Sequence, residues 1–177
     1  MWKTTDSDET QLDARPAPGL VPSDVIRTRF RHLHTSIRLR MTFVDLQRPA
    51  PPQAPLTDGT LYLFRVFVYV ATSQGNGQVI NMDISHRGAG KVTMHPFHGK
   101  GRTRCATSHT IDYRENWIRI SIPRTCLDDP EWVRLGVVNL AQLAPDVSCF
   151  DDVVTDGFAY ATRSFTGVRL TERLYQA

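Results

Sequence analysis

Arginine alternates with other residues in two short segments, and this spacing gathers positive charge on one surface. The five arginines are Arg27, Arg29, Arg31, Arg38 and Arg40. Because alternate residues of a β-strand point to the same side, the pattern predicts a hairpin with one apolar face and one arginine-rich face. Guanidinium groups held side by side repel one another unless carboxylates or an anionic partner offset their charge.

Two interpretations of this predicted surface are open. One is a solvated sheet face with acidic neighbours from an adjacent strand. The other is a docking surface for an anionic polymer, such as a wall polysaccharide, a lipid headgroup or nucleic acid. The formal net charge is only +3, well short of that of a dedicated nucleic-acid binder, so nucleic acid is the least favoured partner.

Three aspartates near the C-terminus have side chains that suit Ca²⁺: Asp151, Asp152 and Asp156. Their spacing does not match the twelve-residue EF-hand loop, which needs alternating ligands and a closing glutamate. A turn held by Asx-type hydrogen bonds is the expected structure instead. Calcium is the one cofactor that the sequence leaves open.

The histidines and the glycine-rich segment give no pattern for catalysis or for a transition metal. His95 and His98 would point to opposite faces of an extended chain, and Pro96 disfavours a helix between them. Residues 88–91 are glycine-rich but lack the full phosphate-loop pattern, and no nucleophile elbow or zinc-helix motif is present. We therefore expect no catalytic residue, and a protein that is not an enzyme.

Residues 105–126 predict a hairpin closed by two cysteines. A two-residue turn at Glu115 and Asn116 would set the register. That register pairs Cys105 with Cys126, Ile111 with Ile120, Tyr113 with Ile118, Asp112 with Arg119 and Arg114 with Trp117. Directly opposed cysteines lie within reach of a disulfide, so we expect a structural bond. Because Glu115 is a poor residue for the positive φ of such a turn, a longer turn with a shifted register is the alternative.

Three further residues bear on function. Trp117 and Trp132 fall at positions expected to face outward, and exposed indole rings there would favour a sugar ligand, since aromatic rings stack on sugar faces. Cys149 is the odd cysteine. We expect it to be a buried small apolar side chain, with an intermolecular bond or a reactive thiol as the alternatives.

Prolines, glycines and the alternation of apolar residues divide the chain into segments. Residues 1–23 indicate a flexible Pro-rich arm, residues 24–177 a single domain, and residues 47–59 a Pro-rich loop. Residues 61–72 are apolar on both faces, as in a central strand, and Arg65 within them would need a partner. Strand-like segments recur at regular spacing and no helical period is sustained. The expected fold is an antiparallel β-sandwich of about 8–10 strands.

Length and composition fit one soluble domain. The chain has 177 residues, of which 41% are hydrophobic and 22% charged. The longest apolar run, within residues 61–71, is too short to span a bilayer. Residues 1–9 lack the pattern of a signal peptide. The protein is therefore expected either to stay inside the cell or to be a mature form that carries an added methionine.

Several segments together resemble a group of small exported β-sandwich proteins of actinobacteria that have no established biochemical activity. They are residues 24–27 (DVIR), 37–46 (IRLRMTFVDL), 111–113 (IDY), 120–127 (ISIPRTCL), 130–137 (PEWVRLGV) and the aspartates at 151, 152 and 156. The resemblance implies an oxidising compartment and a disulfide between Cys105 and Cys126, and it carries no catalytic residues. The chain differs from the group in its arm, its 47–59 loop and Cys149. A weaker similarity links residues 24–46 to sugar- or haem-binding sandwiches of the DOMON type.

The leading functional expectation is a non-catalytic extracellular binding module, secreted or at the cell surface. Its ligand would be a glycan (carbohydrate binding) or an anionic cell-surface polymer. The alternative is a structural or assembly subunit that makes protein–protein contacts through its arm, its loops and Cys149.

Overall fold

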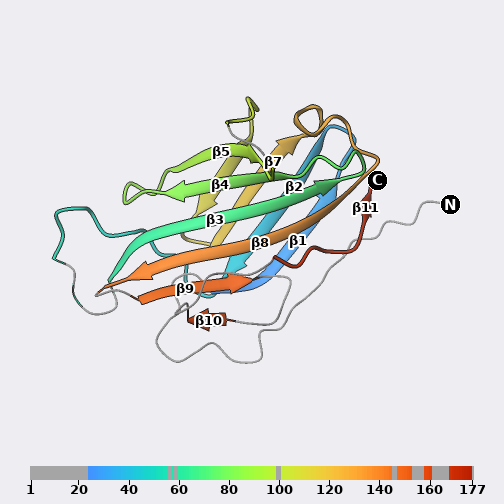
Figure 1. Cartoon of the computed structure of the whole chain (residues 1–177). Coiled ribbons are helices and arrows are strands. Elements are labelled where there is room, and N and C mark those ends of the chain that lie inside the picture. Colours follow the sequence, from blue (N-terminus) through green and yellow to red (C-terminus); the bar gives the residue numbers. More distant parts are fainter. Residues whose placement is uncertain are drawn as a thin grey trace.

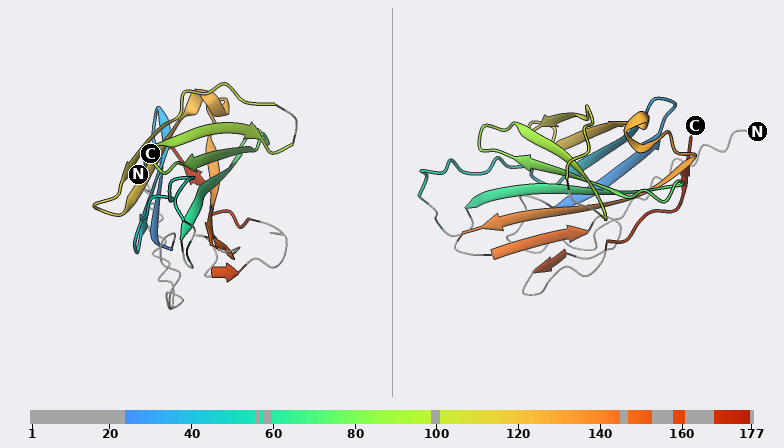
Figure 2. Two further views of the ribbon diagram at one scale, coloured as in Figure 1. Left: turned by 90° about the vertical axis from the view of Figure 1, so that its left-hand side faces the viewer. Right: turned by 45° about the horizontal axis from the view of Figure 1, so that its top comes forward.

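Two antiparallel β-sheets pack face to face in the computed structural model, which describes residues 24–55, 57, 60–98, 101–144, 147–152, 158–160 and 168–176. The four-stranded sheet has the order β1 (Val25–His32), β2 (Ser36–Phe43), β7 (Trp117–Pro123), β6 (Ser108–Asp112). The seven-stranded sheet has the order β10 (Phe158–Tyr160), β9 (Val147–Asp152), β8 (Trp132–Leu143), β3 (Leu61–Thr72), β4 (Gln78–Ile84), β5 (Gly90–Pro96), and β11 (Leu174–Tyr175) pairs with β8. Figure 1 shows this arrangement, and the end view in Figure 2 separates the layers, with β1 on one side and β8 on the other.

The predicted antiparallel β-sandwich is therefore confirmed. The prediction that residues 61–72 form a central strand is also confirmed, because β3 pairs with β4 on one edge and with β8 on the other. Arg65 on β3 forms an ion pair with Asp83, which lies directly opposite it on β4. This carboxylate supplies the partner that a half-buried guanidinium needs.

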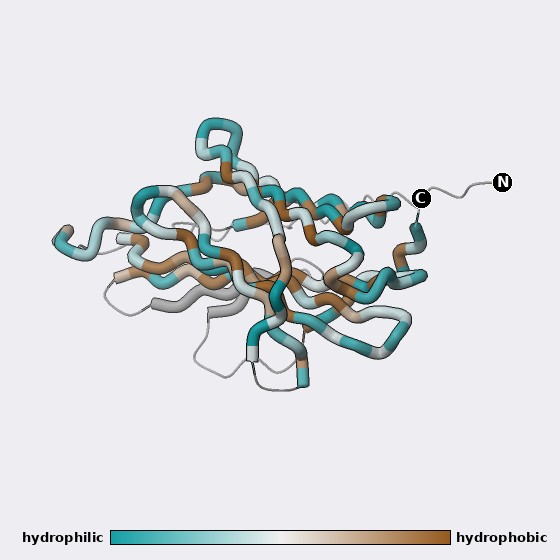
Figure 3. Tube along the Cα trace, turned by 90° about the horizontal axis from the view of Figure 1, so that it is seen from above, coloured by the Kyte–Doolittle hydropathy of each residue, from teal (hydrophilic) through white to brown (hydrophobic). Residues whose placement is uncertain are grey.

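The core forms because alternate side chains of both sheets point inward. Figure 3 shows the resulting alternation of apolar and polar residues along the strands. Ile37, Ile118 and Ile120 of the first sheet are fully buried, as are Val66 and Val68 of the second. Burying one such side chain stabilises the fold by about 1.5–3 kcal/mol. This core fixes which side chains of each strand remain outside.

An aromatic contact joins the two layers. The rings of Phe43 on β2 and Phe64 on β3 meet edge to face, with centroids 5.8 Å apart and planes at 84°. Edge-to-face contact suits the charge distribution of aromatic rings and adds to the area that both bury. The two sheets are therefore held in register by the core as well as by their connections.

The hairpin of β6 and β7 has a different register from the one that a two-residue turn predicts. Ile111 faces Ile118, and Asp112 faces Trp117. The turn spans four residues, 113–116, and only Asn116 takes a positive φ, of 53°. Asp112 Oδ1 accepts hydrogen bonds from two backbone N–H groups of the turn. The predicted pairings of Arg119 with Asp112 and of Arg114 with Trp117 are therefore wrong, because the longer turn spares Glu115 a positive φ and moves the register by two residues.

The disulfide between Cys105 and Cys126 is present, with a Cα–Cα distance of 5.6 Å. The bond was predicted correctly, but the reason given for it was wrong. Cys105 precedes β6 and Cys126 lies in a 3₁₀ turn, η2 (Arg124–Leu127), so neither belongs to the paired strands. The bond instead ties the start of β6 to the turn that follows β7.

The C-terminal segment joins the two sheets at one end. β11 pairs with β8 of the seven-stranded sheet, and the Leu174 carbonyl accepts a hydrogen bond of 3.0 Å from Nδ1 of the buried His32 at the end of β1. The preceding residues lie close against Gly136 of β8, where a Cβ atom would come within 2.6 Å of the Arg169 carbonyl oxygen. Glycine is therefore required at position 136 by the close approach of another backbone.

Candidate anion-binding face

The outer face of the four-stranded sheet carries three rows of side chains that run across its strands. The rows are Arg31, Arg38, Ser121 and Ser108, then Arg29, Arg40, Arg119 and Thr110, then Arg27, Thr42, Trp117 and Asp112. All five arginines singled out from the sequence lie on this face. We call the six arginines of the three rows the arginine face.

Arg119 is the arginine that sequence reasoning missed. It lies between Arg40 on β2 and Thr110 on β6 in the second row. The predicted register set Arg119 against Asp112, and that pairing hid its place in the cluster. Alternation along residues 117–123 already put Arg119 and Trp117 on one side, so the missing signal was the pairing of β7 with β2, for which the sequence has no local pattern.

Acidic side chains are scarce among the described residues of this face. Among the outward side chains of the four strands, Asp112 is the only carboxylate in the part of the chain that the structure describes. It lies at the end of the third row, and its Oδ1 already accepts two backbone hydrogen bonds. Arg38, Arg40 and Arg119 form no ion pair with any described residue. The neighbouring strand β7 thus adds a further cation and no carboxylate to this face.

Trp117 holds two of these arginines in place. The guanidinium carbon of Arg40 lies 4.7 Å from the centroid of the indole ring, and that of Arg119 lies 5.6 Å away. Both distances fall within the range of cation–π attraction, which is worth about 0.5–1 kcal/mol at exposed sites. The ring therefore offsets part of the repulsion between two opposed cations without neutralising either.

The second tryptophan lies elsewhere. Trp132 begins β8 in the seven-stranded sheet, is half-buried, and has the guanidinium of Arg173 4.6 Å from its ring centroid. The two tryptophans predicted to stack on a sugar are thus on different sheets, and a cation contacts each of them. Of the two, only Trp117 belongs to the arginine face.

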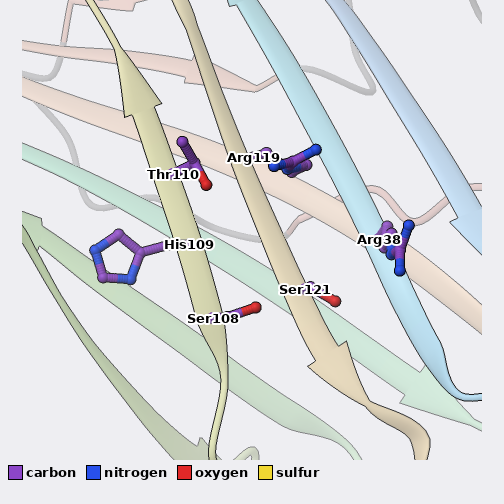
Figure 4. Close-up of a pocket in the computed structure, with 6 residues that line it drawn as sticks. All are labelled: Arg38, Ser108, His109, Thr110, Arg119 and Ser121. Atoms are coloured by element: carbon purple, nitrogen blue, oxygen red, sulfur yellow. The ribbon is translucent and has the colours of Figure 1, made fainter.

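Two adjoining depressions lie on the outer side of this sheet. The arginine depression, of about 220 Å³, is lined by Arg29, Arg31, Arg38, Leu39, Arg40 and Arg119. The hydroxyl depression, of about 200 Å³, is lined by Arg38, Ser108, His109, Thr110, Arg119 and Ser121. Arg38 and Arg119 line both, so the two depressions form one continuous polar surface. In Figure 4 the hydroxyls of Ser108 and Thr110 point toward β7, whereas His109 projects from the other side of β6.

The remaining predicted sites lie either in the seven-stranded sheet and its loops or outside the described residues. Asp156 lies outside the described residues, and the side chains of Asp151 and Asp152 at the end of β9 are not described, so the calcium site stays a prediction. Cys149 is in β9 opposite Ala141, again without a described side chain. Over the described ranges, no group of three histidine, cysteine or acidic residues has the geometry of a metal site. His95 instead hydrogen-bonds through Nδ1 to the Gly101 carbonyl, at 2.9 Å.

Comparison with known proteins adds no relative from which to transfer a role. No family model and no curated protein sequence matches this chain. The resemblance to exported actinobacterial sandwich proteins stays a prediction. No helix in the described ranges is long and apolar enough to cross a membrane.

Proposed function

We propose that the protein is a non-catalytic binding module, secreted or at the cell surface, that holds an anionic polysaccharide on its arginine face. The observation that carries this proposal is the pair of Arg40 and Arg119, which lie directly opposite each other on two adjacent strands and form no ion pair with any described residue. Opposed like charges destabilise a sheet. Such a pair is expected in a protein whose ligand supplies negative charge.

The spacing of the cations suits a polymer. Neighbouring strands lie about 4.8 Å apart, and alternate residues along one strand about 7 Å apart. Arg38, Arg40 and Arg119 therefore belong to a two-dimensional array of positive charge that is larger than one small anion. A chain with repeated anionic groups can engage several guanidiniums at once, which raises its overall affinity above that of each contact. The face is shallow, whereas small-molecule sites enclose most of their ligand.

Two further features support a polysaccharide outside the cytoplasm. Trp117 lies within the array, half-buried, and its ring orients the guanidiniums of Arg40 and Arg119 that would contact an anionic chain. The disulfide of Cys105 with Cys126 is of the kind that persists in oxidising compartments. The resemblance to exported sandwich proteins points to the same location.

The test is titration calorimetry of the whole chain with dextran sulfate and with uncharged dextran, at low and at physiological ionic strength. We expect binding of the sulfated polymer alone, with an affinity that falls as salt rises. The double variant Arg40→Ser with Arg119→Ser should bind at least about tenfold more weakly, because each lost charge-assisted contact contributes on the order of 1.5–3 kcal/mol.

A matched control removes the same charge elsewhere. Arg87 and Arg102 are exposed in loops outside the four-stranded sheet, so Arg87→Ser with Arg102→Ser should leave the affinity unchanged within about twofold. Equal weakening by both double variants would show that only net charge matters, and would refute the arginine face as a site. Light scattering without ligand separates this proposal from an assembly subunit, which would not remain monomeric.

A further inference from the structure

The hydroxyl depression differs from the rest of the arginine face in the kind of donors that it offers. Three adjacent strands supply them: Arg38 from β2, Arg119 and Ser121 from β7, and Ser108 and Thr110 from β6. Ser121 lies directly between Arg38 and Ser108 in the first row, and Arg119 lies beside Thr110 in the second. Guanidinium and hydroxyl donors therefore face one small volume from several directions (Figure 4).

Resting on the proposed function, we infer that this depression binds the tetrahedral oxyanion, a sulfate or phosphate ester, of the anionic polysaccharide. A planar carboxylate has two acceptor oxygens, which a single guanidinium fork satisfies. An esterified sulfate or phosphate presents three free oxygens in different directions. Such a group can accept hydrogen bonds from Arg38, Arg119 and the hydroxyls at the same time, so the donor set fits it better.

The donors are available to a ligand. Ser108 and Thr110 are exposed, and neither these hydroxyls nor that of Ser121 hydrogen-bonds to another residue in the described ranges. No carboxylate lines the depression. His109 is not counted among the donors, because its ring lies on the inner side of β6 and its Nε2 is only 3.0 Å from where a Cβ of Gly90 would be.

The size of the depression points to a substituent, not to a whole sugar. Its volume of about 200 Å³ is below the roughly 300–1,000 Å³ of sites that enclose entire small molecules. The neighbouring arginine depression contributes guanidiniums without hydroxyls, and it would attract any anionic group. We therefore assign general affinity to the arginine depression and selection among anions to the hydroxyl depression.

The test compares dextran sulfate, dextran phosphate and carboxymethyl dextran of matched charge density, which share one backbone. The whole chain should bind the sulfated or the phosphorylated polymer at least about tenfold more tightly than the carboxymethylated one. Whichever of the first two binds more tightly identifies the ester. Equal affinity for all three would overturn the oxyanion site while leaving the proposed function intact, and failure of all three to bind would overturn both.

A charge-neutral variant tests the hydroxyls themselves. Ser108→Ala with Ser121→Ala keeps every arginine, and it should reduce the preference for the tetrahedral group by at least about fivefold while leaving the affinity for carboxymethyl dextran unchanged. Ser85→Ala in the turn between β4 and β5 is the matched control, and thermal unfolding checks that each variant is folded. An unchanged preference in the double variant would overturn the site.

Discussion

Arg40 and Arg119 lie directly opposite each other on β2 and β7, and both guanidiniums contact the same indole ring, that of Trp117. Two like charges in this position repel, and the ring opposes that repulsion without removing either charge. Under the proposed function, an anionic ligand would supply the negative charge that these two guanidiniums lack among the described residues. The repulsion can be tested by measuring the free energy of unfolding as well as the affinity for a ligand.

Replacing one member of the opposed pair should stabilise the fold. In the Trp117→Ala background, where no cation–π contact is lost with the charge, Arg119→Ser removes the repulsion with Arg40, and we expect the free energy of unfolding in urea to rise by about 0.2–1 kcal/mol at low ionic strength. The gain should shrink in high salt, which screens exposed charges. Arg114→Ser, in the turn after β6, is the control and should have no such effect. A loss of stability at every salt concentration would show that Arg119 is held by attractive contacts instead.

The two tryptophans should have separable roles. Trp117→Ala removes the ring that orients Arg40 and Arg119, so we expect several-fold weaker binding of dextran sulfate, and Trp117→Phe should retain most of the affinity because phenylalanine also attracts cations. Trp132→Ala is the comparison, since Trp132 contacts Arg173 on the other sheet. It should lower the melting temperature without changing the affinity. If Trp132→Ala weakened binding without lowering the melting temperature, the ligand would lie on the seven-stranded sheet, and the arginine face would be refuted as its site.

Sequence reasoning recovered the fold and most of the arginine face because both depend on local alternation. The side of a strand on which Arg27, Arg29 or Arg31 lies is set by a period of two and by the apolar residues between them. The central place of residues 61–72 followed in the same way, from a strand that is apolar on both faces.

The parts of the site that sequence reasoning missed depend on register. Arg119, Ser121, Ser108 and Thr110 meet Arg38 only through the pairing of three strands. The pairing of β2 with β7 joins segments that are far apart in the sequence, and no local pattern predicts it. The register of β6 with β7 depends on the length of the turn at residues 113–116, which the positive φ of Asn116 and the hydrogen bonds accepted by Asp112 set. Neither feature has a periodic signal in the sequence.

The disulfide should contribute strongly to stability. Cys105 and Cys126 are 21 residues apart in sequence, and closing a loop of this size stabilises by about 3 kcal/mol in the chain-entropy model. We expect Cys105→Ser with Cys126→Ser to lower the free energy of unfolding by about 2–4 kcal/mol. Alkylation of the denatured, unreduced protein followed by intact mass should label one cysteine, Cys149. Three labelled cysteines would contradict the bond, and a disulfide-linked dimer through Cys149 would favour the assembly subunit.

Acid should weaken the junction between the two sheets through His32. Burial lowers the pKa of this imidazole, the nearby Arg124 lowers it further, and the hydrogen bond to the Leu174 carbonyl opposes both. The folded protein therefore resists protonation of this ring more than the unfolded chain does, and its Nε2 is buried with no hydrogen-bond partner among the described residues. In the unfolded chain a histidine titrates near pH 6.5. Below that pH the unfolded state binds a proton that the folded state resists, so the contribution of His32 to stability is complete above about pH 6.5 and is lost as the pH falls.

His32→Gln tests this sign, because glutamine keeps a donor for the Leu174 carbonyl and cannot become charged. Urea unfolding of both proteins between about pH 5 and 7 should show a steeper loss of stability toward acid in the wild type. The control is His98→Gln, which removes an exposed histidine after β5, leaves the hydrogen bond of His32 in place and should retain the wild-type slope. Identical slopes for the wild type and His32→Gln would mean that His32 is already solvated at the end of β1. In that case the pH dependence of amide hydrogen exchange at β11 would be that of the intrinsic exchange rate alone.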